Sequence, residues 1–540
     1  LSTHDRDREK TMNRDERLAA LPAQAREWLR QSAQAVQQGQ RTHALQFAQQ
    51  VVRAHPDHAD ALRQLASALA ANGRAQEALA VIDPVVARYP DDPELLNTQA
   101  IVLETAGQDE RALAAFRRVC ELQPASAVHA YNLGRALSNR GDSAGSLAEL
   151  ERTLAIDPEH RNARATLAEV LRRLGRTEEA VTHLRVLLGR NPDDVKAWSA
   201  LAALNVAEFD DADIATMERL RARPGLSVDE QVLLAYGLGK AHAAHARYDK
   251  AYAAYVQAKS IVHARQPWNA AAHAAAVDAI LAAFAQAAPA GSDDRRGAGM
   301  IFIVSLPRSG STLTEQILAA HPQVDAGEER TDLLDTIMAE NQRRGQLVEK
   351  WAGLATPDDW RRLGEDYLER SRRWRGTGTH ATDKAPGNWV WLGALFAMLP
   401  GARVIDCRRD PLETAWSCFT HLFKIGAQNF SHDFASIGAY ARDHDRTMRH
   451  WLALYPQRIR TQRYEALVAD PETQIRELLD FCGLPFDPAC LRPHEVERSI
   501  RTASASQVRE PIRRDTARTD KYGALLDPLR KELGLPPFVA

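Results

Sequence analysis

The sequence predicts a multidomain protein in which an all-α solenoid of repeated helix pairs is followed by an α/β domain with a parallel sheet and a P-loop-like phosphate site. Glycine and proline recur every 34 residues through the first half, which is typical of a helical repeat. A β-branched apolar run at 300–305 leads into a Ser- and Gly-containing loop and a helical pattern, as in parallel α/β folds. With 540 residues, the chain is too long for one ordinary core.

Composition and charge narrow the function classes. The chain is 45% hydrophobic and 26% charged, with a formal net charge of −2. No global field would draw it onto nucleic acid or an anionic membrane, so we expect neither as a partner, and any anion site must be local. The charged first residues and the lack of a long apolar run favour a cytoplasmic location. Five scattered cysteines without metal-ligand spacing indicate reduced thiols and no metal site.

The repeat is marked by three residue types at constant phase. Proline stands after the second helix of each unit, glycine closes the first helix through a left-handed turn, and a small residue lets the paired helices approach. The prolines are Pro56, Pro90, Pro124, Pro158 and Pro192, the glycines are Gly39, Gly73, Gly107, Gly141 and Gly175, and the small residues are Ala44, Ala78, Ala112, Ser146 and Ala180. Gly237-Leu238-Gly239, Ala251 and Tyr255 indicate one further unit.

This pattern resembles the tetratricopeptide family over residues 25–194. With the further unit, we predict a lead-in at 1–24, a tetratricopeptide array at 25–265, a helix and linker at 266–299, and the α/β domain at 300–540. The resemblance implies a concave groove that holds a protein or peptide. An array that only forms a homodimer or supports the second domain is the alternative.

The segment Leu306-Pro-Arg-Ser-Gly-Ser-Thr312 is predicted to bind an anion. It joins a strand to a helix N-terminus, where backbone N–H groups and the helix dipole favour negative charge. Gly310 permits close approach, and Ser309, Ser311 and Thr312 add hydroxyl donors. The first Gly and the Lys of a nucleoside-triphosphate P-loop are missing and the cation is Arg308, which disfavours a kinase.

Pro307 to Thr312 resembles the 5′-phosphosulfate loop of the sulfotransferase family, in the branch with the tyrosylprotein sulfotransferases. Residues 401–417 resemble that family's 3′-phosphate signature, in which Arg409 and Ser417 would hold the phosphate. The resemblance implies a sulfotransferase fold, 3′-phosphoadenosine 5′-phosphosulfate as nucleotide co-substrate, and no metal.

The same resemblance implies the catalytic residues. Gly327-Glu-Glu-Arg330 matches a segment whose Glu is the base, so we expect Glu329 as base, Glu328 as alternate, and burial to strengthen it. An acidic pair that only stabilises a helix dipole is the alternative. In Thr382-Asp-Lys384, Lys384 would stabilise the leaving nucleotide, and Arg308 is counted among the catalytic cations.

Two further regions are predicted to contact the nucleotide. Tyr464 stands in Arg463-Tyr-Glu, which continues the resemblance. Near the end, Thr516-Ala-Arg-Thr-Asp-Lys-Tyr522 is shorter than the family's segment and lacks its Trp, and from it we retain Lys521 beside the weaker candidates Thr516 and Arg518.

Together these motifs predict transfer of a sulfuryl group to an acceptor hydroxyl, with a protein or peptide Tyr as the first acceptor to test. The alternative is a repeat scaffold whose second domain is an inactive nucleotide-binding domain.

Overall fold

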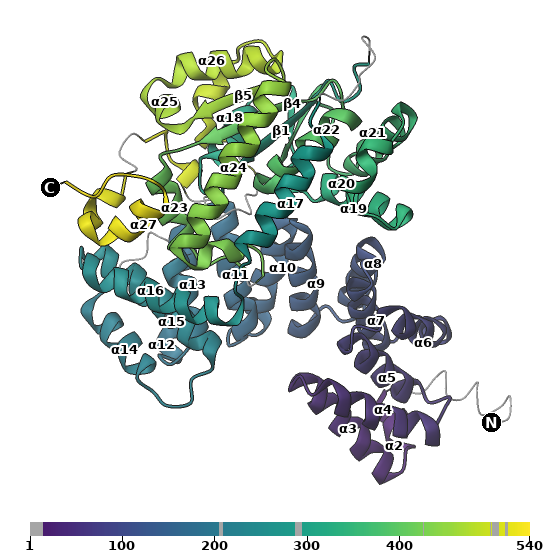
Figure 1. Ribbon diagram of the computed structural model, residues 1–540. Coiled ribbons are helices and arrows are strands. Elements are labelled where there is room, and N and C mark those ends of the chain that lie inside the picture. The colour runs from purple at the N-terminus through teal and green to yellow at the C-terminus, as the bar shows by residue number, and fades with distance from the viewer. Residues whose placement is uncertain are drawn as a thin grey trace. The chain divides into compact units, whose positions relative to one another are not determined.

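The computed structural model describes residues 14–204, 209–286, 294–424, 426–496, 498, 507–513 and 517–539 (Figure 1). The chain divides into two compact units, residues 1–171 and 172–540. The division falls inside the helical array, so the last helix pairs belong to the same unit as the α/β domain. The finer domain limits expected from the sequence remain a prediction.

The N-terminal part consists of α-helices, as predicted, and successive helices pair. Within residues 14–174 they are α2 (Arg14–Ala19), α3 (Ala23–Gln37), α4 (Arg41–Ala54), α5 (Ala59–Ala71), α6 (Ala75–Arg88), α7 (Pro93–Thr105), α8 (Asp109–Leu122), α9 (Ala127–Arg140), α10 (Ser143–Ile156) and α11 (Arg161–Leu174). The following part holds α12 (Thr177–Arg190), α13 (Val195–Ala203), α14 (Asp211–Arg221), α15 (Val228–Ala244), α16 (Tyr248–Arg265) and α17 (Ala270–Ala283).

The repeated residues do what their spacing predicts. The five repeat glycines all have φ between 70° and 92°, the left-handed region that ends a helix without a Cβ clash. The small residues at constant phase are all buried, so each helix packs closely on its partner. At Ser146 the hydroxyl also donates to the Gly134 carbonyl at 2.7 Å. The turn glycines and small contact residues are confirmed.

The second domain is built on a five-stranded parallel sheet. The strands are β1 (Met300–Ser305), β2 (Val324–Ala326), β3 (His380–Lys384), β4 (Arg403–Arg408) and β5 (Ile459–Arg463), in the order β2-β3-β1-β4-β5. The central strand β1 is buried along its length, with Ile303 opposite Lys384 on one side and Ile405 on the other. Strand β1 is therefore the topological switch point, where ligands of α/β proteins bind.

Helices cover both faces of the sheet (Figure 1). One face packs against α17, α19 (Asp332–Arg344), α20 (Val348–Trp351), α21 (Pro357–Ser371), α22 (Leu392–Met398) and α24 (Phe434–Leu454), and the other against α18 (Ser311–Ala319), α25 (Tyr464–Ala469) and α26 (Pro471–Cys482). In β1, Phe302 and Val304 face the first core, and Ile301 and Ile303 face the second. This alternation follows the two-residue period of a strand buried on both faces.

The remaining elements are short. They are η1 (Ala352–Leu354), η2 (Pro386–Trp391), α23 (Pro411–Phe419), η3 (Asn429–His432), η4 (Pro488–Leu491), η5 (Pro493–Glu495), η6 (Gln507–Arg509), η7 (Thr519–Leu526) and α27 (Asp527–Glu532). Among the described residues, no helix combines the length and the apolar character needed to cross a membrane.

Helices α15 and α16 pack against α23 through an aromatic core. The Trp416 ring lies 6.0 Å from Tyr255 and 4.7 Å from Tyr522, measured between ring centroids, with edge contacts to both. Gly239 of α15 makes this packing possible, because a Cβ there would lie 2.5 Å from the Tyr255 ring. Tyr255 is 2% exposed and cannot swing out of the way without losing that core.

We predict that Gly239→Ala destabilises the protein. The overlap with Tyr255 costs about 1–3 kcal/mol, whereas the better helix propensity of Ala returns at most about 1 kcal/mol. Gly189→Ala is the matched control, since Gly189 is also helical and nothing lies within 4 Å of its added Cβ. The midpoint of urea unfolding should fall for Gly239→Ala and stay level or rise for Gly189→Ala; equal midpoints would show that the pair is not tightly packed.

Candidate active site

The residues predicted from the sequence gather at one edge of the sheet. All strands are parallel, so their carboxyl ends meet at that edge. Strand β1 runs into the loop 306–310, β2 into Glu329, β4 into Arg409 and β5 into Tyr464, while Lys384 is the last residue of β3. The fold therefore brings together motifs that lie far apart in the chain.

The loop after β1 is shaped to admit an anion. Gly310 caps α18 with φ of 93°, and a Cβ there would lie 2.8 Å from the Tyr464 ring. Ser309, Ser311 and Thr312 are buried, and α18 begins at Ser311 without a side-chain cap hydrogen bond. Arg308 has φ of 72°, a strained value for a residue with a side chain that recurs at functional sites. This is the geometry of an anion site at a helix N-terminus.

Arg308 reaches the helix that carries the second phosphate motif. Its Nε donates to Ser417 Oγ on α23 at 3.0 Å. Burial, with the nearby cations Arg409 and Arg518, lowers the pKa of Arg308 to about 10. The two predicted phosphate motifs are thus in direct contact, and like charges are held near each other there. A polyanionic ligand would relieve that repulsion.

Arg409 lies beside the predicted aromatic residue. Its guanidinium carbon is 5.0 Å from the centroid of the Tyr464 ring, and its Nη2 donates to Glu413 Oε2 at 3.3 Å. The other oxygen of Glu413 accepts bonds from the backbone N–H of Arg518 and from the N–H and hydroxyl of Thr519, each at 2.7 Å. Glu413 was not predicted; it ties Arg409 to the C-terminal segment.

The C-terminal candidates differ in their placement. Lys521 is exposed on η7, whereas the backbone N–H of Arg518 donates to Glu413. Thr516 lies outside the described residues. The role of Lys521 stays a prediction.

The expected base and cation lie next to each other. Lys384 Nζ donates to Glu329 Oε1 at 3.0 Å; the Lys384 side chain is fully buried, whereas 57% of the Glu329 side chain is exposed. Protein side chains therefore do not bury Glu329 as we expected. Glu328, the alternate base, has φ of 61° and a side chain that is 18% exposed, and its N–H donates to Glu315.

A buried carboxylate holds this acidic loop in place. Glu315 of α18 is 1% exposed and accepts from the Glu328 N–H at 3.0 Å, from Thr382 Oγ1 at 3.1 Å and from Arg498 Nη2 at 3.0 Å. The sequence did not single out Glu315 for a role. Its position on the core-facing side of α18 could have indicated a structural role, because a buried charge requires hydrogen-bonding or charged partners.

Asp383, between Thr382 and Lys384, is a second buried acid that the sequence did not single out. It is fully buried, and its Oδ2 accepts from the Tyr367 hydroxyl at 2.8 Å. Burial raises the pKa of Asp383 to about 7, and the carboxylates of Asp332 and Glu315 add to the rise. Strand β3 therefore carries a buried carboxyl group, that of Asp383, which loses its proton near neutral pH.

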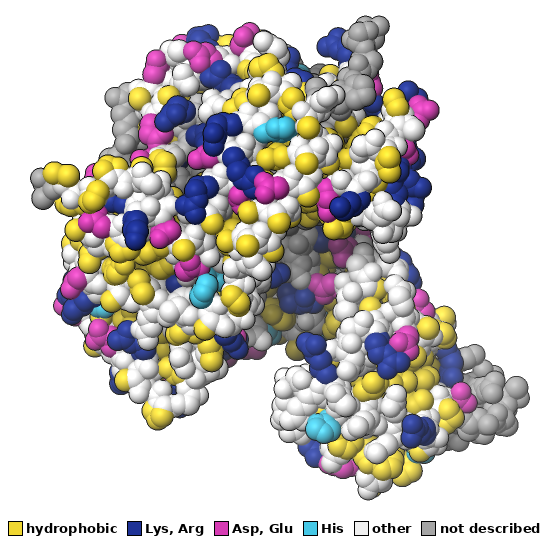
Figure 2. All heavy atoms as spheres, in the orientation of Figure 1, with side chains coloured by type: hydrophobic (Ala, Val, Ile, Leu, Met, Phe, Trp, Pro, Cys, Tyr) yellow, Lys and Arg dark blue, Asp and Glu magenta, His cyan; other side chains and the backbone are white. Residues whose placement is uncertain are grey.

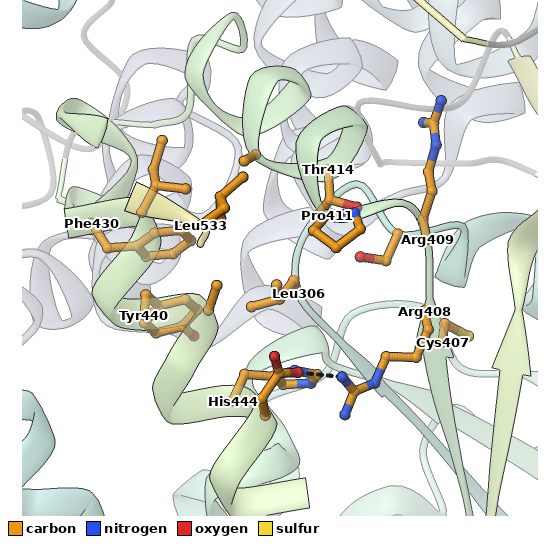
Figure 3. A pocket seen from close by; sticks show the side chains of 15 residues that line it. Leu306, Cys407, Arg408, Arg409, Pro411, Thr414, Phe430, Tyr440, His444 and Leu533 are labelled. Carbon is orange, nitrogen blue, oxygen red and sulfur yellow. Dashed lines mark hydrogen bonds and ion pairs between the residues drawn. The ribbon is translucent and has the colours of Figure 1, made fainter. Parts of the chain in front are cut away.

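A pocket opens beside the phosphate loop, on the α24 side of β4 (Figure 3). Leu306, Ser309 and Tyr440 are among its lining residues. Arg408 pairs with Asp445 toward His444, whereas Arg409 extends in the opposite direction (Figure 3). Successive side chains at the end of β4 thus point to opposite sides of the chain.

The positive charge is local. On the face shown in Figure 2, basic and acidic side chains are interspersed rather than gathered by sign. This fits the net charge of −2 and the expectation that any anion site is local.

We predict that Asp383→Asn changes the pH dependence of stability. The folded-state pKa of Asp383 lies above its ordinary value of 3.8, so keeping the proton favours the fold and deprotonation opposes it. The wild type should lose up to about 4 kcal/mol relative to Asp383→Asn as pH rises from about 4 to 7, with the full difference retained above pH 7. Urea unfolding at pH 5 and pH 8 measures it, with exposed Asp520→Asn as control. A difference independent of pH would contradict the buried-acid assignment.

Comparisons with known proteins match each part of the chain to a family. The sulfotransferase family model matches residues 300–488, and tetratricopeptide repeat models match residues 35–101, 76–127 and 139–204. An uncharacterized protein of Aquifex aeolicus is 31% identical over 329 residues, which are 58% of this chain and 43% of that protein. The chain thus spans less than half the length of that relative.

Two further relatives carry names that specify an activity. A putative protein-tyrosine sulfotransferase of Caenorhabditis briggsae is 26% identical over 45% of this chain and 87% of its own length. Protein-tyrosine sulfotransferase 1 of Danio rerio is 27% identical over 39% of this chain and 60% of its own length.

Among solved structures, a tetratricopeptide repeat protein from Parabacteroides merdae covers 44% of this chain and 94% of its own, with 18% identity and a TM-score of 0.32. The similarity to protein-tyrosine sulfotransferases is distant. The chain carries tetratricopeptide repeats in its N-terminal part and a sulfotransferase family domain in its C-terminal part.

Proposed function

We propose that this protein transfers a sulfuryl group from 3′-phosphoadenosine 5′-phosphosulfate to an acceptor hydroxyl. The observation that carries the proposal is the convergence of the phosphate loop, α23 and the Glu329–Lys384 pair at the carboxyl ends of adjacent strands. An inert nucleotide-binding relic would have no need to keep an acid and a buried ammonium beside the phosphate loop.

Each predicted residue has a role in that proposal. Arg308, the hydroxyls of Ser309, Ser311 and Thr312, and the backbone at Gly310 would hold the 5′-phosphosulfate. Arg409 and Ser417 would hold the 3′-phosphate, with Arg409 supported by Glu413. Tyr464 would line the nucleotide next to Arg409. Arg is suited to phosphate because its planar fork donates two hydrogen bonds at once.

The proposed reaction is an in-line displacement. The acceptor oxygen forms a bond to sulfur while the bond between sulfur and the bridging oxygen breaks, and that electron pair passes to the departing nucleotide phosphate. Glu329 takes the acceptor proton. The Lys384 ammonium stabilises the negative charge that gathers on the bridging oxygen. At 3.0 Å, Glu329 and Lys384 are close enough to act on the two ends of one transfer.

We propose a protein or peptide tyrosine as the acceptor class. The printed names of the Caenorhabditis and Danio relatives specify protein tyrosine. Tetratricopeptide repeats imply protein interactions, and the exposed Glu329 is accessible to a hydroxyl on a large substrate.

We predict micromolar binding of 3′-phosphoadenosine 5′-phosphate (PAP) without added metal. Arg308→Ala and Arg409→Ala should each weaken binding by at least about tenfold, because each removes a charged phosphate donor. The control is Arg463→Ala, an exposed arginine next to Tyr464. Isothermal titration calorimetry in EDTA measures all four proteins. Failure of the wild type to bind would reject the co-substrate.

We predict that Glu329→Gln abolishes most turnover while leaving PAP affinity unchanged. Loss of a general base costs about 10²- to 10⁴-fold in kcat. The matched control is Glu328→Gln, which makes the same chemical change one residue earlier. PAP release from the sulfated donor with a tyrosine peptide in excess measures both variants. If Glu328→Gln instead shows the larger loss, the base is Glu328.

A further inference from the structure

The last repeat helices contact the phosphate helix α23 directly. The Tyr236 hydroxyl of α15 bonds to the carbonyl oxygens of Phe419 at 3.3 Å and His421 at 3.1 Å, where α23 ends. From α16, the Tyr255 ring packs against Trp416, the residue before Ser417. The repeat array therefore fixes the end of the helix that is predicted to hold a phosphate.

This contact places a lysine of the array near the phosphate loop. Lys240 follows Tyr236 by four residues on α15, so both lie on the same face of the helix. Lys240 is half-buried, and burial with the charges of Arg518 and Arg308 lowers its pKa to about 7. The pKa of His421 is also lowered, to about 3. Its burial is the largest cause, and the positive charges of Arg308, Lys240, Lys259 and Arg172 add to it. The charges of the array, the loop and the C-terminal segment therefore act on one another.

A second lysine of the array, Lys259, is fully enclosed by its neighbours and serves as a comparison for Lys240. Lys259 of α16 is 2% exposed, its Nζ donates to Ser431 Oγ at 3.0 Å, and the Tyr236 and Phe419 rings lie within 6 Å. It is enclosed in the interface. Lys240 instead is only partly buried, one turn after Tyr236 on the face of α15 that contacts the end of α23, where the charges of Arg308 and Arg518 act on it.

We infer that the last repeat pair forms one wall of the nucleotide site and that Lys240 binds a phosphate group of the co-substrate together with Arg308. This inference rests on the proposed function, since it assigns a further residue to the same site. The ammonium of lysine is a compact charge suited to phosphate. Because Lys240 belongs to the repeat array, the array contributes to nucleotide binding as well as to partner binding.

The test is PAP calorimetry at pH 8 in two buffers with different ionisation enthalpies. A bound phosphate raises the pKa of a neighbouring ammonium, so the wild type should take up close to one proton on binding. Lys240→Met should bind about tenfold more weakly and lose this uptake. Lys240→Arg should keep the affinity but lose the uptake, because arginine is already charged at pH 8. The pKa of His421, about 3, lies far below pH 8, so His421 is neutral in the free wild-type protein at the pH of the titration.

The control is Lys250→Met, which removes a lysine from the exposed side of the same repeat pair and should bind PAP like the wild type. Thermal unfolding of each variant checks that the fold is retained. If the wild type binds PAP and Lys240→Met binds equally well with the same proton uptake, the inference is wrong and the proposed function stands. If Lys240→Arg binds as weakly as Lys240→Met, the lysine acts through packing and the inference is also wrong. Absence of PAP binding by the wild type would overturn both.

Discussion

The candidate site depends on holding several cations close together at the carboxyl ends of β1 and β4. The hydrogen bond from Arg308 to Ser417 joins the phosphate loop to α23, and the burial of Arg308 near Arg409 and Arg518 lowers its pKa. Such an arrangement costs free energy in the free protein, and the surrounding fold has to offset that cost. A ligand with several negative charges would regain that cost on binding, so the proposed site would favour polyanions.

Two buried carboxylates stabilise this arrangement. Glu413 connects Arg409 to the C-terminal segment, and Glu315 connects the acidic loop after β2 to α18 and Arg498. Neither group is proposed to react. Removing one partner of a buried charged network leaves the others unsatisfied, so these acids fix the positions of the residues that would bind and react. The repeat pair α15–α16 adds a third support by packing on Trp416.

The sequence correctly predicted those features in which local backbone geometry determines the residue type. The turn glycines, the small residues at helix contacts and the buried strand β1 each follow from the residue type and its immediate neighbours in the chain. The structure contains all three. The phosphate loop and the end of β4 were also accessible, because their motifs are contiguous. The sequence did not predict the contact of Arg308 with Ser417, which lies 109 residues away. It also did not predict where Lys240, Glu315 and Glu413 lie. These depend on which helix faces pack together, and one sequence does not specify that packing.

The proposed function requires that the α/β domain recognises a nucleotide by its 3′-phosphate. Calorimetric comparison of PAP, adenosine 5′-monophosphate and Mg-ATP on the wild-type protein tests it most directly. We predict that PAP binds at least about 100-fold more tightly than adenosine 5′-monophosphate, because only PAP carries the phosphate that Arg409 and Ser417 would hold. Equal affinities for PAP and adenosine 5′-monophosphate, or preferential binding of Mg-ATP, would contradict it and favour a scaffold or a nucleoside-triphosphate enzyme.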